Sequence, residues 1–293
     1  MQELEFFTEE FERHRPHLRA VAYRMLGSVS EADDAVQDAW LRVSRAEPGG
    51  VDNMGGWLTT IVARVCLNLL RSRAQRREEP YDVYIPDPIV SPEGGPEPEQ
   101  QALLADSVGL ALLVVLDQLT PAERLVFVLH DLFDMPFAEI APMLNRTPAA
   151  TRQLASRARR RVRGGAPEPD RDLARQRAVV DAFFAAANGG DLEALVAVLH
   201  PDVVLRSDGG VARPQLTMAL HGPEAVAQQA FASTRMGPFV HRVLVNGAAG
   251  VVVAPHGRPQ FVMAFTVTGG RIAAIDVLSD PDRLGHLAID FEE

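Results

Sequence analysis

The sequence predicts a multidomain protein with two all-α domains followed by an α+β domain. Three observations support this prediction. Breaks in composition divide the chain, apolar residues recur at helical spacing through its first half, and strand-like runs with glycine turns fill its last part. The chain has 293 residues, which is long for one ordinary domain. We expect domains at 1–77, 106–164 and 170–293, with 78–105 as an acidic, proline-rich linker.

The first domain contains a helix whose two faces differ. Small and apolar residues from Ala32 to Val43 recur at steps of three and one, and Ser30 with Asp33 resembles a capping box at the start. The opposite face carries Asp34, Gln37, Asp38, Leu41 and Arg42. Taken alone, this face is most simply an ordinary solvated surface.

A second helix of this domain, from Trp57 to about Arg73, carries basic and amide side chains outside its apolar stripe. The inward positions are Leu58, Ile61, Val62, Val65 and Leu69. The other faces carry Arg64, Asn68, Arg71 and Arg73. Trp57 begins the apolar stripe, so we expect it to pack in the core rather than to stack on a base.

The second domain is predicted to contain a helix-turn-helix. Thr120-Pro121-Ala122-Glu123 starts one helix, a short helix covers about 136–144, and Asn145-Arg146 turns the chain into a last helix capped by Thr147-Pro148. An apolar row docks this last helix, formed by Ala150, Leu154, Ala158 and Val162. Its exposed side carries Arg152, Gln153, Ser156, Arg157 and Arg160. These residue types read base edges or grip phosphates, although a basic helix end can also be simply solvated.

The distribution of charge is more informative than its sum. The net charge of −10 argues against a nucleic-acid ligand. However, all 29 basic residues are arginine, and they include two dense groups, at 64–77 and 146–163, in stretches without an acid. The segment 78–106 between them holds eight acids and no arginine. Charges are screened beyond about 8 Å at physiological ionic strength, so DNA would respond to the local patches.

The third domain changes to an α+β pattern. Two helices at about 170–187 and 191–199 precede the strands, and a third helix near 223–234 interrupts them. The strand-like runs are Val203–Arg206, Phe239–Val245, Gly250–Ala254, Gln260–Val267 and Arg271–Leu278.

Composition excludes several kinds of site. Cys66 is the only cysteine, so neither an internal disulfide nor a zinc site of several thiolates can form. The acidic N-terminus has no signal-peptide core, and the longest apolar stretch, 108–116, is about half a membrane span. We expect a cytoplasmic protein without a metal, a cofactor or a membrane partner.

Three runs of residues carry a family resemblance. VAYRMLGSVSEADDAVQDAWLRV and GGWLTTIVARVCLNLLRSR resemble the sigma-2 domain of an extracytoplasmic-function (ECF) sigma factor, and LTPAERLVFVLHDLFDMPFAEIAPMLNRTPAATRQLASRARRRV resembles its sigma-4 domain. Residues 170–293 resemble a SnoaL-like domain of the NTF2-like superfamily, a combination typical of the sigma-J type. The resemblance implies a sigma-2 helical bundle, a sigma-4 helix-turn-helix and an NTF2/SnoaL-like α+β cone.

The resemblance also implies a sigma factor rather than an enzyme. Such a protein binds core RNA polymerase through the β and β′ subunits and directs promoter DNA recognition and transcription initiation. The residues facing polymerase would be Asp34, Gln37, Asp38 and Leu41. The −35 element would be read by Arg152, Gln153, Ser156, Arg157 and Arg160. The −10 element would be read by Arg64, Asn68, Arg71 and Arg73, with the loop 47–56 holding a flipped base.

Three short signatures of this subgroup are present with small departures. They are Tyr84-Ile85-Pro86-Asp87-Pro88 in the linker, Asp208-Gly209-Gly210 without its usual third glycine, and Asp280-Pro281-Asp282-Arg283-Leu284. We expect the last two to contact the first and to set sigma-2 relative to sigma-4, in a state that polymerase or an unknown small ligand shifts. The resemblance also implies that the acidic linker threads the RNA-exit region of polymerase, and a plain solubilising tether is an equally good interpretation of it.

Two other functions stay open at this point. One is a ligand-responsive helix-turn-helix regulator that acts without polymerase. The other is a SnoaL-like cyclase with a DNA-binding arm, which would need an acid–base group among Asp208, His221, His241 and Asp276. The two helices of the first domain favour the sigma factor, because a plain repressor needs neither of them.

Overall fold

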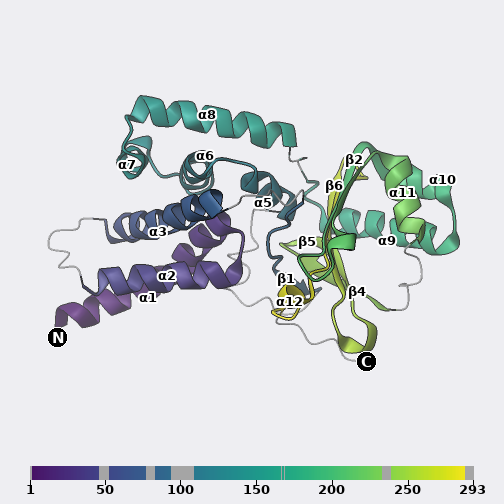
Figure 1. The fold of residues 1–293 in the computed structure, drawn as a ribbon, viewed down its shortest axis with the longest axis horizontal. Helices are drawn as coiled ribbons and strands as arrows, with labels where there is room; N and C mark the ends of the chain where they lie inside the picture. The colour runs from purple at the N-terminus through teal and green to yellow at the C-terminus, as the bar shows by residue number, and fades with distance from the viewer. Residues whose placement is uncertain are drawn as a thin grey trace. The chain divides into compact units, whose positions relative to one another are not determined.

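The computed structural model describes residues 2–45, 53–76, 83–93, 109–165, 167, 169–232 and 239–287. The chain divides into two compact units (Figure 1). The first contains Met1–Pro80 and Val115–Gly165, and the second contains Tyr81–Val114 and Ala166–Glu293. The predicted linker is therefore grouped with the C-terminal α+β region.

Three helices form the N-terminal part of the first unit: α1 (Gln2–Leu26), α2 (Val29–Val43) and α3 (Met54–Arg76). The predicted stripe of α2 is buried except for Trp40, which is half-buried, and the cap of the helix lies two residues earlier than predicted. Ser28 is the N-cap, and its side chain accepts from the Glu31 amide. Ser28 and Glu31 carry the same capping-box spacing as Ser30 and Asp33, so the prediction chose the wrong serine.

The remaining helices of this unit form the expected helix-turn-helix. They are α6 (Pro121–Val126), which continues as the π-helical η1 (Phe127–Leu132), then α7 (Phe137–Ile140), the 3₁₀ turn η2 (Ala141–Leu144) and α8 (Pro148–Gly165). Thr120 and Glu123 make a reciprocal capping box at the start of α6. Asn145 ends η2 with a φ of 52°, a left-handed conformation that asparagine tolerates.

The two helical regions of the first unit share a buried contact. Arg124 of α6 is 2% exposed. Its Nε donates to the carbonyl of Arg24 in α1 at 3.3 Å, and its Nη1 donates to Asp117 at 3.1 Å. Asp117 ends α5 (Leu110–Asp117). The Arg24 guanidinium lies 5.1 Å from the ring centre of Phe133.

The second unit is built on a seven-stranded sheet with the order β1-β4-β5-β6-β7-β2-β3. The strands are β1 (Val90–Pro92), β2 (Leu199–Asp208), β3 (Met218–His221), β4 (Val240–Val245), β5 (Ala248–Val253), β6 (Phe261–Thr268) and β7 (Arg271–Leu278). All neighbours are antiparallel except β2 and β7, which run parallel. The sequence predicted β2 and β4–β7 but neither β1 nor β3.

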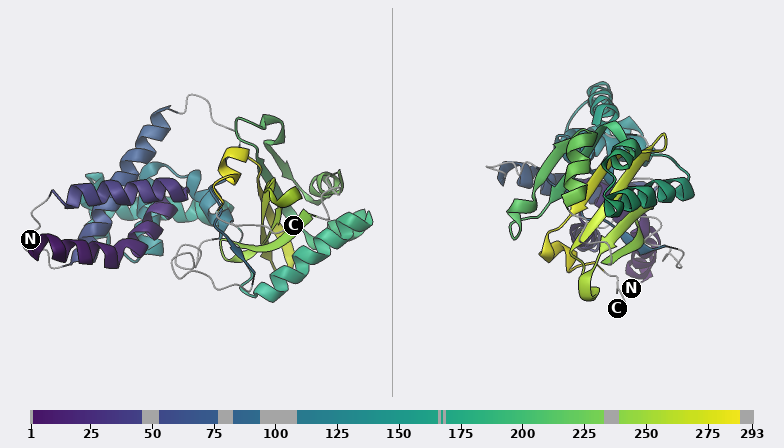
Figure 2. Two further views of the ribbon diagram at one scale, coloured as in Figure 1. Left: turned by 90° about the horizontal axis from the view of Figure 1, so that it is seen from below. Right: turned by 90° about the vertical axis from the view of Figure 1, so that its right-hand side faces the viewer.

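Among its described residues, this unit also contains α9 (Leu173–Gly189), α10 (Leu192–Val198), α11 (Pro223–Ala232) and the short α12 (Pro281–Leu284). α9 packs across β5, β6 and β7, and α11 packs on β2 and β3 (Figure 2). Phe183 of α9 and Phe265 of β6 meet at the centre of the core, with ring centres 5.8 Å apart. The helices therefore cover one face of a curved sheet, as an α+β cone requires.

Candidate functional site

The residues predicted to read the −35 element all lie exposed on α8. They are Arg152, Gln153, Ser156, Arg157 and Arg160. The buried face of the helix consists of Thr151, Leu154, Ala155 and Ala158. Ala150 and Val162 are only half-buried, so the predicted docking row was wrong at both ends. The helix is turned slightly from the predicted setting, and its polar face still points away from the core.

Two other arginines of α8 are occupied within the unit. Arg159 pairs with Asp131 of η1 (Nε–Oδ1 2.5 Å), and Arg161 pairs with Glu123 of α6 (Nη1–Oε2 2.7 Å). These pairs brace the helix against the preceding elements. The arginines of α8 therefore fall into two groups: Arg159 and Arg161 brace the helix, and the others face outward. The number of arginines in the sequence does not show this difference.

The residues predicted to read the −10 element divide in a similar way. Arg64, Asn68 and Arg71 are exposed on α3, beside Leu69, which is 36% exposed although the sequence predicted it to face inward. Arg73 instead forms an ion pair with Glu31 and donates to the carbonyl of Leu26 at 3.2 Å. Trp57 is half-buried, and residues 47–52 of the predicted base-holding loop lie outside the described residues.

The residues predicted to contact polymerase are exposed together on α2. Asp34, Gln37 and Asp38 lie along one face, and Leu41 is 45% exposed in line with them. A large apolar side chain among acids makes a mixed surface of the kind that protein partners cover.

The linker residues 83–93 are docked on the second unit. Val83, Ile85, Pro86 and Pro88 are buried, and Ile85 is fully so. Val90–Pro92 then form β1, which pairs antiparallel with β4 at the edge of the sheet (Figure 1). A proline at the end of an edge strand is tolerated because its missing amide needs no partner there.

Arg283 of α12 is the centre of the contacts that hold this linker. Its guanidinium donates to Asp87 Oδ1 (2.6 Å from Nε), to the Ile85 carbonyl (2.5 Å from Nη2) and to Asp208 Oδ2 (2.9 Å from Nη1). It also lies over the ring of Tyr84, 5.1 Å from the ring centre. Burial opposes its charge, but Asp87, Tyr84 and Asp208 raise the pKa of Arg283 above the usual arginine range. We call Arg283, Asp208 and the linker segment 84–87 the linker clasp.

Asp208 completes the clasp from the end of β2. Its Oδ2 accepts from the amide of Ile85 at 3.0 Å, and its Oδ1 accepts from the amide of Gly210 at 3.0 Å. Gly210 has a φ of +59°, and a Cβ there would collide with the Asp280 carboxylate. Glycine is therefore required to bring this turn against α12.

The third signature contributes to the clasp unevenly. Asp280 caps α12 by accepting from the Asp282 amide at 3.0 Å, Pro281 is the first helical residue, and Leu284 is buried. The Asp282 side chain is exposed, and among the described contacts none joins it to the linker. Arg283 is the residue of this segment that reaches the linker.

Two residues that the sequence analysis did not single out fasten the rest of the linker. Asn246 lies in the turn between β4 and β5. Its side-chain Oδ1 accepts from the Ile89 amide at 3.1 Å, and its backbone amide donates to the Ile89 carbonyl at 2.8 Å. Arg177 of α9 is 7% exposed and pairs with Glu93, while also donating to the carbonyls of Gly250 and Val243. Arg177 follows Leu173 by four residues and precedes Val180 by three, so its place on the inward face of α9 was visible in the sequence.

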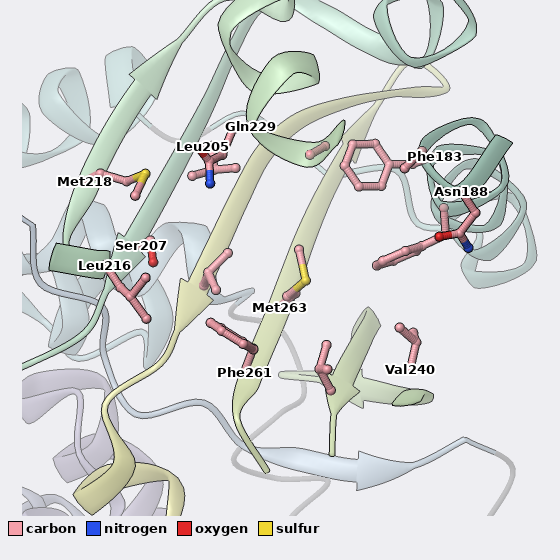
Figure 3. Close-up of a pocket in the computed structure, with 15 residues that line it drawn as sticks. Phe183, Asn188, Leu205, Ser207, Leu216, Met218, Gln229, Val240, Phe261 and Met263 are labelled. Atoms are coloured by element: carbon pink, nitrogen blue, oxygen red, sulfur yellow. The ribbon is translucent and has the colours of Figure 1, made fainter. Parts of the chain in front are cut away.

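A cavity of about 150 Å³ opens within the second unit. Figure 3 shows side chains from α9, β2, β3 and β6 that face the same space, among them Phe183, Leu205, Met218 and Met263. Its described lining contains no acid, base or histidine; Asn188, Ser207 and Gln229 are the polar members.

The candidate acid–base groups lie away from this lining. Asp276 points to the other side of β7, where it is 1% exposed and pairs with Arg206 at 3.1 Å. Burial raises the pKa of Asp276, and Arg206 partly offsets the rise. Asp208 belongs to the clasp, and neither His221 nor His241 lines the cavity.

Other kinds of site find no support in the described residues. Across the described ranges, no cluster of histidine, cysteine and carboxylate side chains could hold a metal ion. No helix among them is long and apolar enough to cross a membrane.

Comparison with family models divides the chain into three matches. The Sigma-70 region 2 model matches residues 11–76, the Sigma-70 region 4 model matches residues 109–162, and the SnoaL-like domain model matches residues 180–275.

Relatives from Mycobacterium tuberculosis match nearly end to end. "ECF RNA polymerase sigma factor SigJ" is 37% identical, with 94% of this chain and 92% of that protein covered. "Probable ECF RNA polymerase sigma factor SigI" is 34% identical, with 94% and 93% covered. The crystal structure of the SigJ protein matches with a TM-score of 0.77 and 35% identity, covering 94% of this chain and 97% of that one. The chain belongs to the ECF RNA polymerase sigma factors that carry a C-terminal SnoaL-like domain.

Proposed function

We propose that this sigma factor binds core RNA polymerase and promoter DNA, and that its docked linker regulates both activities. The polymerase surface is the exposed face of α2 with Asp34, Gln37, Asp38 and Leu41. The −35 reader is the exposed face of α8, and the −10 reader is the face of α3 with Arg64, Asn68 and Arg71. Binding to polymerase places the protein in the cytoplasm.

Arg73 enters this proposal in a different role from its neighbours. Its bonds to Glu31 and Leu26 make it a brace between α3 and the first two helices. Contact with the DNA backbone would require it to leave them. We therefore assign the specific contacts to the three exposed residues.

The observation that carries the regulatory part is the burial of the linker. Residues 83–90 are buried except for the half-buried Tyr84 and Asp87, and the clasp bonds both the amide and the carbonyl of Ile85. A segment held in this way cannot at the same time follow a path along polymerase. Docking and polymerase engagement therefore compete, and polymerase shifts the population toward the released state.

The neutral lining of the cavity supports a non-enzymatic role for the SnoaL-like domain. General acid–base chemistry needs a titratable group within hydrogen-bond reach of the reacting atoms. The described lining offers amides and one hydroxyl instead. We therefore propose that the domain acts on the linker and catalyses no reaction.

The test is promoter-dependent transcription in vitro with core polymerase and the full chain. Arg283→Ala removes the side-chain bonds that α12 gives to the described part of the linker, so we expect more transcript than with the unaltered chain at limiting polymerase. The matched control is Arg242→Ala, because Arg242 is exposed and pairs only with Asp181 among described ion pairs. Equal transcript from all three proteins would refute the regulatory part. If none of the three proteins gives promoter-dependent transcript, the sigma-factor assignment is refuted.

A further inference from the structure

One of the predicted −35 readers on α8 is held by an aromatic ring. Arg152 lies exposed near the start of this helix, and its guanidinium lies over the ring of Phe137, 5.7 Å from the ring centre. Phe137 is half-buried and begins α7. Within the described residues, no side-chain hydrogen bond, ion pair or ring contact holds the other readers, which are Gln153, Ser156, Arg157 and Arg160.

The Phe137 ring is itself held in place by η1. The imidazole of His130 packs on it, with the ring centres 3.8 Å apart and the ring planes at 33°. The Nδ1 of His130 lies 3.0 Å from the carbonyl of Met135 and must be the donor, because a carbonyl oxygen only accepts. Met135 is buried, and its amide donates to the Leu129 carbonyl at 2.8 Å. The imidazole is therefore fastened to the backbone, and it gives the Phe137 ring a fixed neighbour.

The π-helical segment η1 supports α8 at two points. One support is His130, which acts on Arg152 through the Phe137 ring. The other is Asp131, which pairs with Arg159 (Nε–Oδ1 2.5 Å) about two helical turns further along α8. π-helical turns are uncommon and often lie at functional sites. Here η1 fixes both the position of α8 and the direction of one of its readers.

The kind of contact decides what Arg152 can still do. A guanidinium that pairs with a carboxylate uses N–H donors on it, as Arg159 does with Asp131. An aromatic ring instead attracts the cation through its quadrupole, so the N–H donors of Arg152 stay available. Guanine offers two acceptors in the major groove, O6 and N7, that match the guanidinium fork. The ring of Phe137 therefore limits the directions of this side chain without occupying the groups that read a base.

A reader that is held before binding gains affinity. A free arginine side chain loses rotamer freedom when it docks on a base, and that loss weakens binding. The ring removes part of this loss in advance. The gain is confined to the base pair that Arg152 contacts, because the ring holds no other predicted reader among the described residues.

We propose that Phe137 is a positioning residue for the −35 reader, and that its ring directs Arg152 toward a bidentate contact with one guanine of the −35 element. This role rests on the function proposed above, since it requires α8 to lie in a major groove. Phe137 acts through Arg152 and needs no contact of its own with DNA.

The test uses holoenzyme formed from core polymerase and the full chain. The probe is the duplex that the unaltered holoenzyme selects from a library of random sequences, with a series that changes each −35 base pair in turn. Discrimination at a base pair is the ratio of the Kd for the changed duplex to the Kd for the selected duplex. Arg152→Ala should lower this ratio about tenfold at one G·C pair. Phe137→Leu should lower it at the same pair by about twofold to fivefold, the range of an exposed cation–π contact.

Two further variants separate positioning from packing. Phe137→Tyr keeps the ring and should match the unaltered chain at every base pair. Phe137→Leu combined with Arg152→Ala should bind the selected duplex no more weakly than Arg152→Ala alone, because the ring acts through that arginine.

The matched control is Phe133→Leu. Phe133 is also half-buried and also lies beneath an arginine, Arg24, but that arginine belongs to α1. This variant should leave discrimination in the −35 element unchanged. Thermal unfolding of each variant checks that it folds, and Phe137→Met takes the place of Phe137→Leu if the latter does not fold.

The outcomes distinguish this role from the function on which it rests. The positioning role is overturned by an even loss across the series in Phe137→Leu, by a double variant weaker than Arg152→Ala, or by a Phe137→Tyr variant as poor as Phe137→Leu. It is overturned equally if Phe133→Leu loses the same discrimination. If Arg152→Ala leaves every ratio unchanged, or the unaltered holoenzyme selects no sequence, the −35 assignment itself fails and the positioning role fails with it.

Discussion

Arginine serves opposite purposes in the two units of this protein. On α8 and α3, the guanidinium groups of Arg157, Arg160 and Arg64 project outward from exposed positions. In the second unit, Arg177 and Arg283 are turned inward, and each reaches a carboxylate and at least one backbone carbonyl. The first set is available to phosphate and guanine, whereas the second set satisfies the polar groups of a docked segment.

The difference shows that the residue type does not decide the role; the acceptors within reach decide it. The acid-free stretches of the sequence contain the outward arginines, while Arg177 and Arg283 both have aspartate or glutamate partners from the acidic linker. Two of the linker acids, Asp87 and Glu93, therefore have partners in the chain itself. The following predictions test this division, from the largest expected effect to the smallest.

Arg177→Met should have the largest effect. It leaves the carbonyls of Gly250 and Val243 and the Glu93 carboxylate without their buried partner, so we expect a loss of about 3–5 kcal/mol in the stability of the second unit. This loss of stability is measured by hydrogen exchange of the backbone amides in β4 and β5. Both tryptophans, Trp40 and Trp57, lie in the first unit, so their fluorescence should change little. Arg175→Met, at an exposed position, is the control; an equal loss there would contradict the assignment.

Arg157→Ala should weaken promoter binding by about 1–3 kcal/mol if Arg157 reads a base edge, and it should relax specificity at one position of the −35 element. Holoenzyme binding to a promoter series measures both quantities. Arg163→Ala, at the exposed end of the same helix, should lower affinity evenly across the series. A uniform loss for Arg157→Ala would mean that this residue grips phosphate.

Asp208→Asn should loosen the linker without unfolding the unit. The change removes the charge that faces Arg283 but keeps the shape of the side chain, so we expect the clasp to weaken by about 1–2 kcal/mol. Exchange of the Ile85 amide should then be roughly tenfold faster, while the Ile89 amide, held by Asn246, should respond less. Equal acceleration at both amides would show that the linker leaves as one piece.

Asp276→Asn should produce the smallest effect, and that effect should depend on pH. Burial raises the pKa of Asp276, so the folded state takes up this proton at a higher pH than the unfolded chain does. The contribution of the carboxyl to stability therefore falls as the pH rises from about 4 through the folded pKa. The free energy of unfolding of Asp276→Asn, relative to that of the unaltered chain, should therefore rise over that pH interval. A stability difference that stays constant with pH would contradict the raised pKa.

Much of the fold could be predicted because its signals are local. Helical periodicity located α2, α3 and α8, and the capping box of Thr120 and Glu123 placed the start of α6. The errors have local causes too. Two serines shared one capping spacing before α2, and β1 is only three residues long and contains a proline, so it had no alternation to detect.

The candidate site was less predictable because its partners are distant in the chain. The resemblance named the three signature segments, but nothing in the sequence says that Arg283, rather than Asp282, turns to the linker, since that depends on how α12 starts after Ser279. The pairing of Arg73 with Glu31 and the docking of Ile89 on Asn246 likewise depend on tertiary contacts. Arg177 was not singled out, although a lone arginine on an apolar helix face indicates a buried acceptor.

The clasp also has an order of assembly, because Arg283 follows Asp87 by 196 residues. A ribosome adding about 5–20 residues per second completes α8 well before it reaches Arg283, and roughly 10–40 s separate the two clasp partners. During each round of synthesis, the α3 and α8 surfaces therefore exist before the residue that closes the linker. The youngest copies of the protein are those in which the linker is still unclasped.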